Sequence, residues 1–97
     1  MNEERKIVRT YSAGVFFGTL TERSADGKRG LIRDARRLWY WDDAASLSQL
    51  AEEGTASPKT CKFPCTVKTI EVTEIIEVLS VTEAAEKSID AVPVWKR

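Results

Sequence analysis

The chain has 97 residues, of which 42% are hydrophobic, and it carries 15 basic and 15 acidic side chains. A chain of this length can bury one core, so we expect a single domain spanning residues 1–97. The zero formal charge argues against a protein that tracks a nucleic-acid polymer, and no run of about 18 apolar residues is present to cross a membrane. We therefore expect a cytoplasmic protein, since the charged first residues also lack the apolar stretch of a signal peptide.

The N-terminal half is predicted to form three strands. Residues 6–11 and 15–23 are rich in β-branched and aromatic side chains, and a glycine-containing turn between them indicates a hairpin. A third strand is expected over 30–41 after an Asp-Gly turn. Unbroken alternation along this segment would place Arg33 and Arg37 on one face, together with small or apolar side chains.

The C-terminal half is predicted to contain two helices and two more strands. Residues 44–51 have helical apolar spacing and are followed by Gly54, a typical helix-terminating residue. Alternation over 67–79 indicates two strands joined near 73–74. A second helix is expected from the N-cap Thr82 to a point before Pro93. Together, the elements of the two halves predict an α+β fold, in which an antiparallel sheet of about five or six strands carries two short helices.

Charge is unevenly distributed along the chain. Residues 23–37 contain six basic and two acidic side chains, whereas residues 71–90 contain six acidic and one basic. Two solvated faces of opposite sign, used for docking between elements or subunits, would account for this pattern. A local basic site for phosphate is the alternative.

The side-chain inventory argues against catalysis. The chain has no histidine, so a nucleophilic serine or cysteine lacks its usual base. Cys61 and Cys65 are interpreted as reduced thiols rather than as half of a metal site, and the adjacent Asp42 and Asp43 would point apart in extended chain. We therefore expect no enzyme activity, no metal and no cofactor. The aromatic run 39–41 indicates a core or interface cluster, with ligand stacking as the alternative.

Several local sequences carry a family resemblance. The segments are 8–18 (VRTYSAGVFFG), 35–42 (ARRLWYWD), 44–51 (AASLSQLA), 61–64 (CKFP) and 92–95 (VPVW). Together they resemble short phage proteins of the first-described Thoeris anti-defence family. Members of that family bind cyclic ADP-ribose isomers without degrading them and so keep them from the Thoeris effector. Some members also hold cyclic trinucleotides of the CBASS system at separate sites.

The resemblance implies an assembly and a set of site residues. It implies homodimers that can combine into hexamers, with ligand pockets between protomers, acting in the host cytoplasm during phage infection. It places Arg9, Arg36 or Arg37, and Phe63 at the cyclic ADP-ribose pocket. The resemblance also implies a polar or arginine contact to the ligand from the C-terminal part of the chain. The residues at the corresponding places are Thr73, Lys87 and Ser88.

These assignments fit the chemistry of such a ligand, although each residue also has a plain structural interpretation. An aromatic ring can stack on a purine, and a guanidinium can grip a pyrophosphate. Phe63 could equally cover the core, and Arg9 and Arg36 could form salt bridges. Two other classes stay open: a virion or assembly component with no small ligand, and a protein inhibitor of a nuclease that presents the acidic 71–90 segment.

Overall fold

The computed structural model describes residues 4–42 and 44–96, so Asp43 of the adjacent acidic pair lies outside the described residues. Five strands form one antiparallel sheet in the order β4-β3-β2-β1-β5, which confirms the predicted α+β class. The elements in chain order are β1 (Lys6–Thr10), β2 (Val15–Thr21), β3 (Gly30–Arg37), α1 (Leu47–Glu53), a 3₁₀ turn (Pro58–Thr60), β4 (Thr66–Val72), β5 (Ile75–Ser80) and α2 (Glu83–Asp90).

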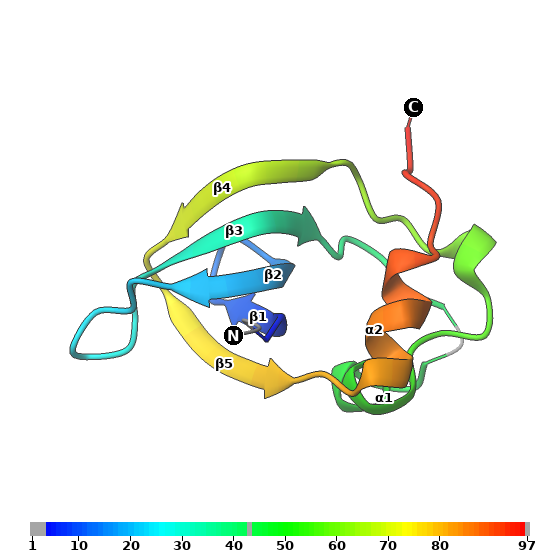
Figure 1. The fold of residues 1–97 in the computed structure, drawn as a ribbon, viewed down its shortest axis with the longest axis horizontal. Helices are drawn as coiled ribbons and strands as arrows, with labels where there is room; N and C mark the ends of the chain where they lie inside the picture. The colour runs from blue at the N-terminus through cyan, green and yellow to red at the C-terminus, as the bar shows by residue number, and fades with distance from the viewer. Residues whose placement is uncertain (1–3, 43, 97) are drawn as a thin grey trace.

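The two edge strands of the sheet are joined directly to each other. β4 and β5 lie at opposite edges, yet only Thr73 and Glu74 separate them in the chain. The sheet therefore curls until the two edges meet at one end (Figure 1). Backbone hydrogen bonds hold this link in place, from Tyr11 N to Glu74 O at 2.9 Å and from Ile75 N to Lys28 O at 2.8 Å.

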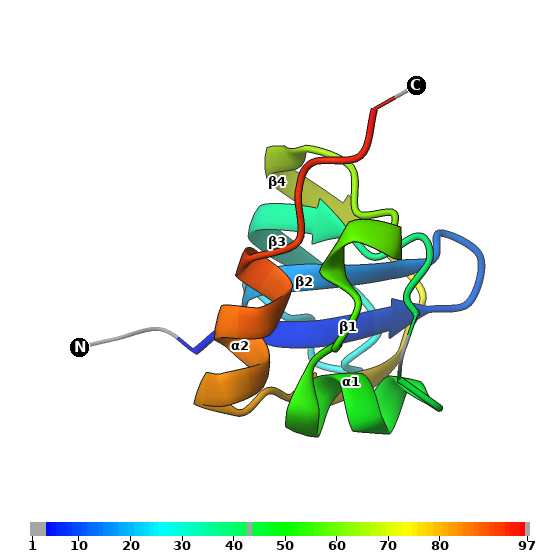
Figure 2. The same cartoon turned by 90° about the vertical axis from the view of Figure 1, so that its right-hand side faces the viewer.

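Each face of the sheet carries its own hydrophobic core. The first, which receives a side chain from every strand, consists of Val8, Phe16, Ile32, Ala35, Val72 and Ile75. The second lies on the face that the helices cover (Figure 2) and includes Ile7 and Phe17 packed with Leu50 and Ile89. Consecutive residues such as Phe16 and Phe17 point to opposite faces, so β1 and β2 are buried on both sides.

The caps Thr82 and Gly54 are confirmed, whereas α1 begins at Leu47 rather than at residue 44 and has Ser46 as its N-cap. Ser46 accepts a hydrogen bond from Gln49 N at the start of α1, and Thr82 accepts one from Ala85 N at the start of α2. Gly54 ends α1 with φ of 77° and lies against α2. A Cβ at this position would collide with Ser88, so glycine is needed both for the backbone angle and for the close approach of the helices.

The third strand differs most from its prediction. β3 ends at Arg37 rather than at residue 41, and a bulge centred on Asp34, whose φ is 50°, interrupts its alternation. Arg33 consequently lies on the face opposite Ile32, whereas Arg37 pairs with Phe16 and shares the face of the first core. The expectation that Arg33 and Arg37 share a face is wrong because the bulge adds one residue to β3.

No helix within the described ranges is long and apolar enough to cross a membrane.

Candidate ligand-binding site

The residues that the family resemblance places at a ligand site do not converge within one protomer. Arg9 is exposed on β1 and its Nε donates to Glu77 Oε1 at 2.9 Å. Lys87 is exposed on α2 and pairs with Glu83 at 3.5 Å. Thr73 lies in the link between β4 and β5. Of the expected site residues, Arg36 and Phe63 are in contact with each other, whereas Arg37 lies on the other face of β3.

Arg36 is a buried clamp that ties β3 to the C-terminal part of the chain. Its side chain donates to four backbone carbonyls: Nε to Pro64 at 3.1 Å, Nη1 to Ile89 at 3.2 Å, and Nη2 to Phe63 at 3.1 Å and Val92 at 2.7 Å. Burial lowers the pKa of this guanidinium, an effect that Asp90 partly opposes. Since ordinary arginine pKa values lie far above neutrality, the clamp is charged at pH 7.

Phe63 is fully buried in the core beneath the helices. The guanidinium carbon of Arg36 lies 5.5 Å from the centre of its ring. In this protomer, Phe63 and Arg36 are therefore occupied by contacts within the fold, and neither presents a surface to a ligand.

Arg37 lines an open cleft on the other side of β3. The cleft has a volume of about 360 Å³ and lies between the β1–β2 turn and the segment that follows β3. Gly14 lies in this turn with a φ of 97°. Its carbonyl accepts a 2.9 Å hydrogen bond from Thr10 N. A bond of 2.8 Å from Leu38 N to Val15 O holds the two walls together. The lining residues are Ala13, Gly14, Val15, Arg37, Leu38, Trp39 and Trp41.

The guanidinium of Arg37 is held by stacking and keeps its hydrogen-bond donors available. Its central carbon lies 4.8 Å from the centre of the Phe16 ring. Within the described part of the chain, no hydrogen-bond acceptor or carboxylate contacts this guanidinium. Stacking on a buried ring restrains a long side chain without using its N–H groups. Arg37 is thus a preoriented cation beside two indole rings.

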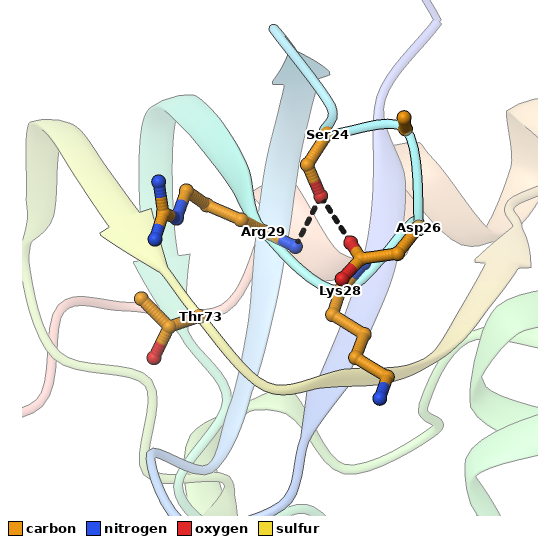
Figure 3. A pocket seen from close by; sticks show the side chains of 6 residues that line it. Ser24, Asp26, Lys28, Arg29 and Thr73 are labelled. Carbon is orange, nitrogen blue, oxygen red and sulfur yellow. Dashed lines mark hydrogen bonds between the residues drawn. The ribbon is translucent and has the colours of Figure 1, made fainter.

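A second pocket, of about 450 Å³, lies where the β2–β3 loop approaches Thr73 (Figure 3). Much of its polar lining serves the loop itself. Asp26 accepts hydrogen bonds from Ser24 Oγ at 2.6 Å and Lys28 N at 3.0 Å, and these bonds lower the pKa of its carboxyl. Lys28 and Arg29 make the pocket basic, but it has no aromatic wall.

The family resemblance indicated Arg36 or Arg37, and ligand stacking by the aromatic run 39–41 was the alternative to a core or interface role. Trp39 is 58% exposed, and it lines the cleft together with the half-buried Trp41. The run 39–41 by itself favours a core or interface cluster, because tryptophan side chains are usually buried. The available signal was the direct succession of an arginine pair and an aromatic run at the end of a strand.

Comparison with known proteins gives one family. The model of a family described as a domain of unknown function (DUF6948) matches residues 3–89. No curated protein and no solved structure matched the chain. Because the matched region includes all five strands and most of α2, this chain belongs to the DUF6948 family.

Proposed function

We propose that this protein binds a small nucleotide signal of the cyclic ADP-ribose class and sequesters it without cleaving it. The observation that carries the proposal is Arg37, whose unused guanidinium donors lie beside Trp39 and Trp41 in an open cleft. Together with the sequence resemblance, this supports a phage anti-defence role against Thoeris signalling. Cyclic trinucleotides of the CBASS system are a second ligand class that the resemblance suggests.

The cleft offers the two groups that such a ligand requires. A guanidinium presents a planar fork of donors that can bind two phosphate oxygens at once. An indole ring provides a flat surface for a purine, and stacking of a base on an aromatic side chain contributes roughly 1–3 kcal/mol. Arg37 would hold the pyrophosphate, and Trp39 or Trp41 would stack on the base.

Sequestration follows from the character of the groups in the cleft. An arginine side chain stays protonated at neutral pH and cannot act as a general base, and an indole offers only an N–H donor. No histidine exists in the chain to activate water or a hydroxyl. The cleft can therefore bind and orient a nucleotide, but it contains no group that would break a glycosidic or pyrophosphate bond.

Capture by such a protein should be stoichiometric and reversible on denaturation. For a signal active at low concentration, we expect a dissociation constant in the nanomolar range, about −12 kcal/mol. In the family that the sequence resembles, bacterial TIR-domain enzymes make the cyclic ADP-ribose isomers. Adding the protein to the product of such an enzyme should abolish effector activation in proportion to the binding sites added. Heating the complex until the protein denatures should restore activation, and mass spectrometry should identify the released ligand as intact.

The same experiment separates a sponge from an enzyme. Clearance of the signal by substoichiometric protein, or release of a hydrolysed product on heating, would show that the protein is a catalyst.

The size of the cleft predicts that two protomers contribute to a complete site. At about 360 Å³ it lies near the lower end of the range for small-molecule sites, roughly 300–1,000 Å³, which enclose most of the ligand surface. A neighbouring protomer would supply the missing walls. Light scattering should therefore give a dimer or a hexamer at micromolar concentration. A monomer that still binds nucleotide tightly would contradict the shared site.

An interaction module of a virion or assembly particle is the second candidate. It is favoured by Trp39, Tyr40 and Val94, which are 58%, 47% and 48% exposed. Ultraviolet absorbance near 260 nm that co-purifies with the protein and is released on denaturation would favour the nucleotide sponge. Protein that is free of nucleotide and does not bind any from the TIR-enzyme product would favour the interaction module.

A further inference from the structure

Three aromatic rings surround the ammonium group of Lys62. The Nζ atom lies 5.5 Å from the ring centre of Trp39, 5.8 Å from that of Tyr40 and 5.7 Å from that of Trp95. Trp39 and Trp95 also contact each other, with ring centres 4.9 Å apart and planes tilted by 38°. We call these three rings the Lys62 cage.

Backbone hydrogen bonds position every wall of the Lys62 cage. Trp39 N and Tyr40 N both approach the Lys62 carbonyl, at 3.2 Å and 3.3 Å, and Lys62 N donates to Tyr40 O at 2.8 Å. Trp95 N donates to Phe63 O at 3.0 Å, next to a bridge between Phe63 and Val94. The rings therefore belong to two segments that are hydrogen-bonded to the same short stretch of chain. Because these bonds involve only the backbone, we expect the rings to keep their places when the lysine side chain leaves.

The lysine is a weakly held occupant. All three distances are close to the limit of about 6 Å at which a cation interacts appreciably with a ring. No carboxylate among the described residues pairs with Lys62, which is exposed. A primary ammonium is compact and strongly hydrated, so it gains little by leaving water for aromatic faces.

We propose that the Lys62 cage is a binding site for alkylated ammonium groups, and that Lys62 fills it until such a group displaces the side chain. A quaternary ammonium has no N–H donors to keep hydrated and presents methyl groups to the rings. Cages of two or three aromatic side chains are the usual means by which proteins recognise such cations. This site takes a different ligand from the proposed nucleotide cleft, with which it shares Trp39.

The test is titration with tetramethylammonium chloride at constant ionic strength, followed by NMR shifts of the indole N–H groups. Lys62→Ala should bind the cation about tenfold more tightly than the parent protein because the competing side chain is gone. Lys59→Ala removes a nearby exposed lysine outside the cage and should bind like the parent. Adding Trp95→Ala to Lys62→Ala should abolish the gain, as read from the Trp39 resonance.

Thermal melting of each variant would confirm that it is folded. The proposal is overturned if Lys62→Ala binds no more tightly than the parent, or if the double variant keeps the gain. Arg37→Gln should leave binding of tetramethylammonium unchanged, so that failure of the cage and failure of the nucleotide cleft are distinguishable. Choline and a trimethyllysine peptide, titrated against Lys62→Ala, would assign the source: tighter binding of the peptide indicates a protein partner, and tighter binding of choline indicates a free amine.

Discussion

Replacing Arg36 with alanine is expected to lower the free energy of unfolding by about 3–5 kcal/mol. Four charge-assisted hydrogen bonds would be lost, three of them in buried surroundings. The carbonyls of Phe63 and Ile89 would keep backbone donors, Trp95 N and Val92 N, whereas the carbonyl of Val92 would keep no donor among the described residues. A buried carbonyl without a partner costs roughly 1–3 kcal/mol, and local rearrangement would recover part of the sum. In a domain of this size, the melting temperature should fall by at least about 12 °C, measurable by circular dichroism.

The adjacent arginine provides the matched control. Arg37→Ala removes a side chain of the same type from the next position, but an exposed one, and should change stability by only about 0.5 kcal/mol. Arg36→Lys should give an intermediate loss, since an ammonium keeps the charge but cannot reach all four carbonyls. If Arg36→Ala melts at the temperature of the parent protein, the clamp does not stabilise the fold.

Arg37→Gln is expected to weaken nucleotide binding by about tenfold to hundredfold while leaving the melting temperature unchanged. The substitution keeps a polar side chain but removes the charge-assisted contact with phosphate, which contributes about 1.5–3 kcal/mol. Calorimetric titration with a cyclic ADP-ribose isomer would measure the loss. Adenosine, which lacks phosphate, should bind parent and variant equally weakly, since it depends only on stacking.

Two further arginine variants locate the site. Arg29→Gln alters the basic pocket at the β2–β3 loop and should bind the nucleotide like the parent. Arg9→Gln tests the placement implied by the family resemblance, on a side chain already paired with Glu77. If Arg9→Gln loses binding and Arg37→Gln does not, the ligand lies over β1 and the Arg37 cleft is not its site.

Local patterns predicted most of the elements because these depend on neighbouring residues. The hairpin of β1 and β2, the cap Thr82 and the glycine that ends α1 require only short-range chemistry. The bulge at Asp34 cannot be predicted from neighbouring residues, because its positive φ depends on how β3 fits against β2. At that point the two strands are so close that a Cβ at Gly18 would meet Ile32 and the backbone of β3. Unbroken alternation therefore assigns the residues on one side of the bulge to the wrong face of the sheet.

The candidate site was harder to predict because it depends on which distant segments of the chain pack on each face of β3. Arg36 and Arg37 are adjacent and chemically identical, and alternation shows only that they point in opposite directions. Helix α2 and the segment around Phe63, both distant in sequence, make one a buried clamp and leave the other open. An aromatic residue such as Phe63 likewise has no local signal that separates a stacking platform from a core side chain.

The pairing of the first strand with the last governs when the fold can form. Ile7 lies opposite Leu79, so closure of the sheet must bring together segments from nearly opposite ends of the chain. Contacts between residues far apart in the sequence cost loop-closure entropy, so they form late in folding. Proteins rich in such contacts fold slowly for their size. During synthesis, the edge of β1 stays unpaired until β5 has left the ribosome. The domain should therefore acquire its native structure only after β5 has been synthesised, as one cooperative unit.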